Sequence, residues 1–210
     1  MDIISSLKWR AAVRQYDTNK KVSSDDLEAL LEAGNLAATS MGLQPFKIIA
    51  ISNQDIKKQM VPMSYNQEQV SEASHLLVFA IETDINEDTI QRYFNRIMKI
   101  RGLKSEDLEN YKSSVTGYLS EMDSETKKVW ATKQAYIALG TVMSAAAALK
   151  IDSCAMEGFL ADEYTKLLNL DSKNLMPVVA LTIGYRSELE QMASLPKVRK
   201  TRDEFVLEIN

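Results

Sequence analysis

No charged residue occurs between Gln134 and Leu149, so this stretch cannot lie on a fully solvated surface. It is shorter than the roughly 20 apolar residues that a membrane-spanning helix needs, and it contains the polar residues Gln134, Thr141 and Ser144. A helix that is apolar on nearly every side belongs in the interior of a globular protein. We therefore predict a buried central helix here, which other elements must cover.

Three further apolar runs predict buried strands. They comprise Phe46 to Ser52, Leu76 to Ile81 and Val178 to Ile183, and between them they are rich in Ile, Val and Phe. Strands that alternate with helical segments indicate a layered α/β or α+β domain. Because no repeat, low-complexity segment or Pro/Gly-rich linker divides the chain, residues 1–210 are predicted to form a single domain.

Hydrophobic periodicity predicts helices around these strands. Residues 23–33 have the pattern of a capped amphipathic helix, with acidic residues in the first turn, leucines at helical spacing and Gly34 as the stop. A long helical region, charged from Asn86 to Lys128, leads into the apolar stretch described above. The tail from Glu204 to Ile209 alternates polar and apolar residues like an edge strand, which would allow it to pair with a partner chain.

Charge and cysteine content narrow the class of protein. The chain has 25 Lys and Arg against 29 Asp and Glu, a net charge of −4, and so lacks the concentrated basic surface that nucleic-acid binding needs. Its one cysteine, Cys154, cannot form an internal disulfide, and the N-terminal residues show no pattern of a leader peptide. We expect a cytoplasmic protein with a small-molecule partner and neither a nucleic-acid nor a membrane partner.

Two basic clusters are candidate anion-binding sites. Arg10 and Arg14 are one helical turn apart and would share one face of an N-terminal helix. Lys197 and Arg199 would point to the same side of an extended segment. The planar fork of arginine donates two parallel hydrogen bonds to a phosphate, and lysine adds a mobile point charge. A solvated basic surface is the alternative explanation for either cluster taken alone.

Two short segments could present backbone groups to a ligand. Thr39 to Phe46 is a small polar run that leads into a strand, and Gly158 follows the apolar helix after a short connection. An ordinary loop is the alternative for both. His75 and Cys154 lie beside or within apolar runs and are expected to be structural. The absence of a dinucleotide fingerprint, a Walker-type loop and clustered metal ligands argues against kinases, hydrolases and a metal site.

Taken together and in this order, the motifs resemble the FMN-dependent nitroreductase family over nearly the whole chain. The segments that carry the resemblance are Arg10 to Asp17, Thr39 to Phe46, Asn66 with Ala73-Ser74-His75, Gln134 to Gly140, Glu157-Gly158-Phe159, Gly184-Tyr185-Arg186 and Leu195 to Arg199. The resemblance implies an α+β fold with a central, mostly antiparallel sheet flanked by helices. It also implies a homodimer, with the long central helix at the interface and a C-terminal strand that reaches the partner subunit.

The resemblance also implies a flavin site that is built from many segments. The residues implied to contact the flavin are Arg10, Ala11, Ala12, Arg14, Thr39, Ser40, Gly42, Asn66, Gln69, Glu157, Gly158, Lys197 and Arg199. The phosphate would be bound by Arg10, Lys197 and Arg199. Asn66 would bond the pyrimidine ring, while the backbone of Glu157 and Gly158 would face N5 and O4.

The remaining members of the implied site have different tasks. Arg14 would lie at the N1/C2 carbonyl edge, where a guanidinium stabilises the negative charge that follows hydride transfer to N5. Thr39, Ser40 and Gly42 would reach the flavin of the neighbouring subunit. The sequence departs from the family pattern at Gln69, where a lysine is often found, and at residues 11–12, where two alanines replace a polar pair. Less positive charge at position 69 predicts a lower reduction potential.

The activity implied by the resemblance is ping-pong electron transfer. NADH or NADPH would reduce the flavin, and a nitroaromatic, a quinone or another flat electrophile would then reoxidise it, with Arg14 and Glu157 flanking the flavin and no side chain as the chemical catalyst. A covering segment is expected between residues 87 and 122; its candidate aromatic side chains are Tyr93, Phe94, Tyr111 and Tyr118. The alternatives are a specialised flavin reaction such as dehalogenation or enone reduction, a non-catalytic flavin-binding protein, and a flavin-free dimerisation module.

Overall fold

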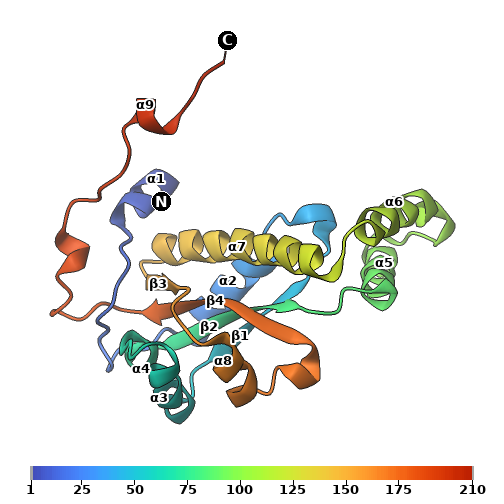
Figure 1. Ribbon diagram of the computed structural model, residues 1–210. Coiled ribbons are helices and arrows are strands. Elements are labelled where there is room, and N and C mark those ends of the chain that lie inside the picture. The colour runs from blue at the N-terminus through green and yellow to red at the C-terminus, as the bar shows by residue number, and fades with distance from the viewer. Residues whose placement is uncertain (1, 210) are drawn as a thin grey trace.

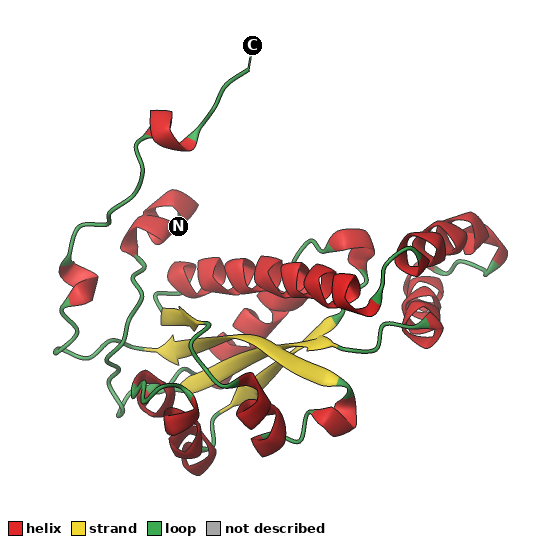
Figure 2. Ribbon diagram, viewed as in Figure 1, coloured by secondary structure: helices red, strands yellow, loops and turns green. Residues whose placement is uncertain are grey.

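The computed structural model describes residues 2–209 and is built around a four-stranded sheet. The strands are β1 (Phe46–Ile51), β2 (His75–Glu82), β3 (Asp152–Met156) and β4 (Leu175–Gly184), in the order β1-β2-β4-β3. Every neighbouring pair is antiparallel. Helices cover both faces of the sheet (Figure 1 and Figure 2). The predicted α+β architecture is confirmed.

The helices form a layer on each face of the sheet, and one pair of helices, called the α5–α6 excursion below, projects from its side. In the described part of the chain they are α1 (Ile3–Trp9), α2 (Ser24–Asn35), α3 (Gln54–Met63), α4 (Gln69–Glu72), α5 (Glu87–Arg101), α6 (Glu109–Ser120), α7 (Ser124–Ala148), α8 (Ala161–Leu167) and α9 (Arg202–Phe205). α2 and α7 lie over one face of the sheet, α3, α4 and α8 lie over the other, and α5 and α6 project from one side (Figure 1). Side-chain oxygens of Ser23, Asn53, Asn86 and Asp123 cap α2, α3, α5 and α7.

Alternating side chains of β2 belong to two separate hydrophobic cores. Leu77, Phe79 and Ile81 pack with the core under α2 and α7, whereas Leu76 and Val78 pack with the core over α3 and α8. All five side chains are buried. Because both faces of the strand are covered, its sequence is a continuous apolar run, and this is why pattern alone located it.

The three predicted strands are confirmed as β1, β2 and β4, whereas β3 was missed. Asp152, Ser153 and Cys154 do not have the composition of a buried strand, yet all three are buried. Arg186 makes the burial of Asp152 possible, since its Nε lies 2.9 Å from Oδ1 and its backbone N–H donates to Oδ2 at 2.8 Å. The partner comes from a part of the sequence that only the fold brings near.

The prediction that Gly34 ends α2 is wrong. The helix continues to Asn35, and Gly34 lies within it. A Cβ atom at this position would lie 2.7 Å from Ile48 Cδ1 and 3.0 Å from Val142 Cγ2. The glycine therefore allows α2 to approach β1 and α7 closely.

The predicted central helix is confirmed as the second part of α7, but it is buried on one side only. Ala135, Ala138 and Val142 face the core and are fully buried. On the opposite side, the Ile137 side chain is 43% exposed, and a Cβ on Gly140 would meet nothing within 4 Å. The single chain thus leaves an apolar helix face uncovered.

Both termini differ from their predictions. α1 ends at Trp9, so Arg10 and Arg14 do not share a helical face; instead the following segment is extended, and Ala12 forms a parallel bridge with Ser153 of β3. The tail does not form a strand within the described residues. Thr201 and Glu204 form a capping box, which folds residues 202–205 into the short helix α9 before the chain extends again.

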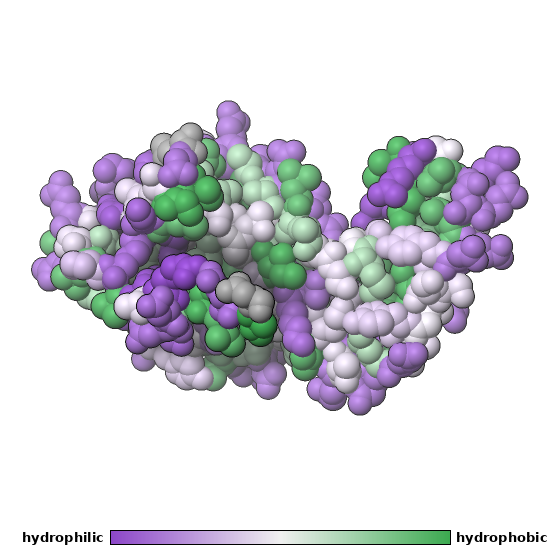
Figure 3. Space-filling view, turned by 90° about the horizontal axis from the view of Figure 1, so that it is seen from above, coloured by the Kyte–Doolittle hydropathy of each residue, from purple (hydrophilic) through white to green (hydrophobic). Residues whose placement is uncertain are grey.

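The α5–α6 excursion stands off from the main body as a second lobe when the molecule is viewed from above (Figure 3). In Figure 1 this lobe lies at the end of the molecule opposite α1 and the C-terminal tail. Among residues 2–209, no helix has both the length and the apolarity required to cross a bilayer.

Candidate functional site

Opposite ends of the chain bring three basic side chains together. Lys197 Nζ donates to the carbonyl oxygen of Lys8 at 2.5 Å, which anchors the tail beside the end of α1. Burial and the charges of Arg10 and Arg199 lower the pKa of Lys197, and burial followed by the charge of Arg199 lowers the pKa of Arg10. In the described chain, none of these three cations pairs with a carboxylate. The cluster is therefore suited to bind an anion such as a phosphate.

Two buried polar atoms of the predicted site are unpaired. Arg10 Nε and Thr39 Oγ1 have no hydrogen-bond partner among residues 2–209. An unsatisfied buried polar group costs about 1–3 kcal/mol, so a bound group that pairs with such atoms is favoured. A third atom of this kind, Trp130 Nε1, lies on α7. The residues present therefore fit a polar ligand that supplies hydrogen-bonding groups.

The extended segment after α1 is held along the edge of β3. The backbone N–H groups of Arg14 and Gln15 donate to Glu190 Oε2 at 2.7 and 3.1 Å, and Val13 N–H donates to the Ser153 carbonyl at 3.4 Å. The Arg14 side chain is exposed, and Ala11 and Ala12 are at least partly accessible. These contacts fix the backbone that carries Arg14 and leave its guanidinium free to meet a ligand.

Gln67 joins two predicted ligand-binding segments. Its Nε2 donates to the carbonyl oxygen of Gly158 at 2.9 Å, and its Oε1 accepts a hydrogen bond from Gln69 Nε2 at 3.0 Å. The exposed Asn66 has a left-handed backbone with φ 58°. The structure thus brings Asn66 and Gln69 to the turn that contains Glu157 and Gly158. Gln67 was not predicted as a site residue, and only its place between Asn66 and Gln69 could have indicated its role.

Tyr136 of α7 is a second neighbour of this turn that the sequence analysis missed. Its hydroxyl donates to Glu157 Oε1 at 2.5 Å. Burial, with the carboxylate of Glu157 as a further cause, raises the pKa of Tyr136 to about 12, so the hydroxyl keeps its proton at neutral pH. The hydrogen bond ties the Glu157 side chain to α7.

Residues 39–42 form a loop that three helices hold in place. Ser40 N–H donates to Gln134 Oε1 of α7 at 2.8 Å, while the Met41 carbonyl accepts hydrogen bonds from Tyr93 of α5 and Tyr111 of α6. Within the described chain, no hydrogen bond joins this loop to the other predicted site segments. Thr39, Ser40 and Gly42 therefore form a separate group on the single chain.

Comparison with known proteins identifies the family. The sequence profile described as the nitroreductase family matches residues 7–185. The chain belongs to the nitroreductase family. A protein of Staphylococcus haemolyticus provisionally named NAD(P)H nitroreductase is 34% identical over 198 residues, which is 89% of each chain. A protein of the same provisional name from Haemophilus influenzae is 33% identical over 217 residues, or 97% of this chain and 94% of that protein. Family membership makes the chain an oxidoreductase.

Solved structures show the same fold. An Exiguobacterium sibiricum protein in complex with FMN superimposes with a TM-score of 0.85 at 21% identity, covering 100% of this chain and 98% of that chain. An enone reductase of gut-bacterial fatty-acid metabolism superimposes with a TM-score of 0.83 at 20% identity, with the same coverage. The nitroreductase-like fold therefore accommodates all of the described elements.

Within this nitroreductase fold, the predicted aromatic residues of the covering segment separate into three environments. Phe94 is only 2% exposed and packs edge-on against Tyr93 and Tyr111 with ring centroids 5.3 Å apart in both pairs, so its prediction as a ligand-facing residue is wrong. The hydroxyls of Tyr93 and Tyr111 donate hydrogen bonds to the carbonyl oxygen of Met41. Tyr118 is 46% exposed and makes no side-chain hydrogen bond within residues 2–209.

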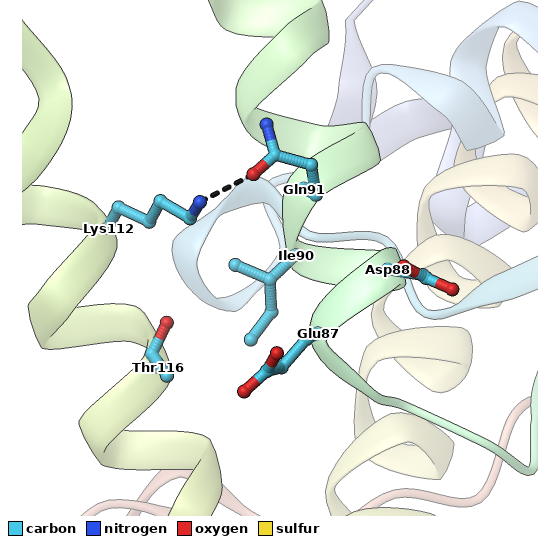
Figure 4. A pocket seen from close by; sticks show the side chains of 6 residues that line it. All are labelled: Glu87, Asp88, Ile90, Gln91, Lys112 and Thr116. Atoms are coloured by element: carbon cyan, nitrogen blue, oxygen red, sulfur yellow. Dashed lines mark hydrogen bonds between the residues drawn. The ribbon is translucent and has the colours of Figure 1, made fainter. Parts of the chain in front are cut away.

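A cavity within the α5–α6 excursion does not include any predicted flavin residue. It is lined by Glu87, Asp88, Ile90, Gln91, Lys112 and Thr116. Figure 4 shows that Lys112 reaches across it to Gln91, where Nζ donates to Oε1 at 2.5 Å. This hydrogen bond bridges α5 and α6 across the cavity, which is a gap between these two helices.

His75 and Cys154 occupy structural positions. Ser74 Oγ accepts a hydrogen bond from Val22 N–H at 2.8 Å and lies 3.0 Å from His75 Nδ1. Burial raises the pKa of the Cys154 thiol, and the nearby cations Arg14 and Arg10 oppose this shift without reversing it. The thiol is therefore not activated as a nucleophile.

Proposed function

We propose that this nitroreductase-family protein is an FMN-dependent oxidoreductase that takes electrons from NADH or NADPH and delivers them to nitroaromatics, quinones or similar flat electrophiles. The observation that carries the proposal is the cluster of Arg10, Lys197 and Arg199, in which, among residues 2–209, the cations have no carboxylate partner and the buried Arg10 Nε has no hydrogen-bond partner. A terminal phosphate fits such a cluster. The names of the sequence relatives and the FMN-bound structural neighbour support the same cofactors.

The other predicted residues fit the ring end of FMN. When bound, this group supplies two-electron chemistry at its N5 atom. Arg14 would add positive charge at the N1/C2 edge, and Ala11 and Ala12 would let the backbone approach the ring closely. Asn66 and Gln69 would bond the pyrimidine edge. The backbone of Glu157 and Gly158 would bond N5 and O4, and Gln67 fixes the relative position of these two segments.

We further propose a homodimer in which each flavin contacts both subunits. The exposed Ile137 on α7 supports this arrangement, as does the 39–42 loop, whose hydrogen bonds to other elements go to α5, α6 and α7 and not to the other predicted flavin-binding segments of the described chain. Leu207 and Ile209 in the tail are 87% and 90% exposed, which is costly for a solvated monomer. Covering these apolar surfaces with a second copy would bring Thr39, Ser40 and Gly42 to the partner's flavin.

The outer edge of β1 is the proposed position of the partner's tail. β1 and β3 are the two edges of the sheet, but the bridge between Ala12 and Ser153 occupies the edge at β3. A groove beside β1 contains apolar side chains together with two basic residues, Lys47 and Arg96, and one carboxylate, Glu82. The tail carries Glu204 and Glu208 among apolar residues, and strand addition would require α9 to unfold and these carboxylates to leave their partners in the single chain, Thr201 and Arg202. Opposite charges and an open edge favour strand addition at this position.

The visible absorption spectrum of the purified protein, before and after anaerobic addition of NADPH or NADH, tests the proposal. We expect flavin bands that bleach with either donor, and weaker flavin retention in Arg199→Ala. The matched control is Arg101→Ala, which removes an arginine from the last turn of α5. Colourless protein that stays free of flavin after incubation with FMN would refute the proposal and favour a flavin-free dimerisation module.

Two narrower alternatives predict different kinetics. A non-catalytic flavin-binding protein would bind FMN but fail to oxidise NADPH with menadione as the acceptor. A specialised reductase would oxidise NADPH with one class of acceptor only; the enone reductase with the same fold makes enones a necessary member of the test panel. Comparable turnover with nitroaromatics and quinones supports the broad activity.

A further inference from the structure

Two tyrosines from the α5–α6 excursion converge on one backbone carbonyl. Tyr93 Oη lies 2.5 Å and Tyr111 Oη lies 3.0 Å from the carbonyl oxygen of Met41. Burial, with the neighbouring Tyr111 hydroxyl as a further cause, raises the pKa of Tyr93 to about 12, so this phenol remains a proton donor at neutral pH. A carbonyl oxygen has two lone pairs and can accept both hydrogen bonds.

The Met41 carbonyl belongs to a backbone segment with a disfavoured conformation. Met41 and Gly42 have consecutive left-handed conformations, with φ 55° and φ 71°. A residue with a side chain is disfavoured in this region, so Met41 persists there only because its surroundings hold it. Tyr93 Oη is also the nearest atom to the Cβ that a side chain at Gly42 would carry, at 3.1 Å. The loop and the tyrosines are fitted to one another.

The other end of the same loop is held independently. Gln134 Oε1 accepts the N–H of Ser40 at 2.8 Å, and Gln134 Nε2 donates to the Trp130 carbonyl at 3.0 Å. Ser40 is thus bound to α7, and Met41 is bound to α5 and α6. Thr39, whose buried hydroxyl has no partner within the described chain, lies directly beside this doubly held backbone.

We propose that Tyr93 and Tyr111 are positioning residues for cofactor binding. By fixing the Met41 carbonyl they hold Thr39 and Ser40 in the geometry that contacts the flavin of the partner subunit, so the α5–α6 excursion controls FMN affinity from a distance. This inference rests on the proposed function as an FMN-binding dimer. It assigns the two hydroxyls a role that ring packing does not require, because Phe94 packs between the same rings without any hydroxyl.

Tyrosine-to-phenylalanine variants separate the hydroxyls from the rings. We would titrate FMN into the apo forms of wild type, Tyr93→Phe, Tyr111→Phe and the double variant, using flavin fluorescence, and measure the thermal unfolding of each apo protein. Each single variant is expected to raise the Kd for FMN by about two- to tenfold, the range of one net hydrogen bond. The double variant is expected to exceed the product of the two, since it leaves the carbonyl without either donor.

Tyr118→Phe is the matched control, because Tyr118 is also on α6 and its hydroxyl makes no hydrogen bond within residues 2–209. Its Kd should equal that of wild type. Unchanged FMN affinity in the double variant would overturn the inference, as would a lower unfolding temperature of the apo protein without any change in Kd. Wild-type protein that fails to bind FMN would instead refute the proposed function, so the two failures are distinguishable.

Discussion

The side-chain amide of Gln67 donates to the carbonyl oxygen of Gly158 over 2.9 Å, although the two residues are 91 positions apart in the sequence. The same nitrogen donates to the Ser64 carbonyl at 2.9 Å. One amide therefore links the segment that follows α3 to the turn that follows β3. Both segments are assigned to the ring end of the flavin, so their relative position depends on this link.

Replacement of Gln67 by glutamate should weaken FMN binding. The variant has almost the same shape, but its carboxylate oxygen would face two carbonyl oxygens where the amide donates to both. We expect the Kd for FMN, measured by fluorescence titration, to rise by about five- to 150-fold, because an unmet acceptor costs about 1–3 kcal/mol. Gln59→Glu on the exposed side of α3 is the control. An unchanged Kd in Gln67→Glu would exclude the link from cofactor binding.

Replacement of Gln69 by lysine should raise the reduction potential of bound FMN. The Gln69 side chain is 5% exposed and already donates to Gln67, so an ammonium group could keep that contact and bring a positive charge to the pyrimidine edge. We expect an increase of about 30 mV by potentiometry, equivalent to about 1.4 kcal/mol for a two-electron couple. Gln69→Met, which is neutral, should not raise the potential. An equal potential in Gln69→Lys and wild type would contradict the prediction.

Glu190 should make the free energy of unfolding depend on pH in the acidic range. Burial acts to raise the pKa of this carboxyl, but backbone N–H donors led by Arg14, Gln15 and Met192 outweigh it and hold the pKa below the ordinary value of 4.5. A carboxylate with a depressed folded-state pKa stabilises the fold above its unfolded pKa, and this stabilisation is lost as the pH falls through the folded value.

The comparison of wild type with Glu190→Gln tests this assignment. Near pH 7 the variant should be less stable by about 1 kcal/mol in urea unfolding, since charge-assisted bonds are replaced by a neutral one at a partly exposed position. The difference should begin to shrink as the pH falls below about 4.5, the ordinary value for the unfolded chain, and should continue to shrink as the pH falls through the lower folded-state pKa. A stability difference that is constant down to acid pH would show that the charge of Glu190 is not responsible.

Replacement of Gly184 by alanine should destabilise the fold. A Cβ at this position would lie 2.8 Å from Tyr16 Cδ1 and 3.1 Å from the backbone nitrogen of Ser74. The Tyr16 ring cannot move away freely, because it is buried and its hydroxyl is bonded to Thr182. We expect a loss of about 1–3 kcal/mol in urea unfolding, as for other overpacked sites. Gly117→Ala on α6, where a Cβ would meet nothing within 4 Å, should be neutral or stabilising.

Local patterns predicted the elements that are buried by their own composition. β2 and β4 are apolar on both faces, β1 is apolar except for Lys47, and α7 has an uncharged second half, so a short window of sequence is enough to predict each of these elements. β3 does not, since the partner that neutralises Asp152 is Arg186, which lies far along the chain. The prediction at Gly34 was wrong for a similar reason. A glycine near a helix end usually terminates the helix, but Gly34 is required where α2 packs closely against β1 and α7, and this contact involves remote segments.

In the candidate site, too, the residue types could be predicted from the sequence, but their arrangement could not. The types of residue that suit a flavin phosphate were visible in the sequence, but their convergence depends on the extended segment after α1 and on the tail that returns beside it. The predicted helical face for Arg10 and Arg14 failed because pairing with β3 competes with helix formation. The hydrogen-bond partners of Gln67, Tyr136, Tyr93 and Tyr111 could not be predicted, because each lies on a remote segment of the chain.

Composition and spacing over a few residues define which stretches must be buried, where most helices begin and which side chains can hold an anion. The packing of remote segments sets which of those side chains meet, which polar atoms of the described residues are left unpaired and which carbonyl two distant tyrosines share. Hydrogen bonds and close approaches between remote segments depend on angstrom-scale positions, and no periodic pattern along the chain encodes those positions.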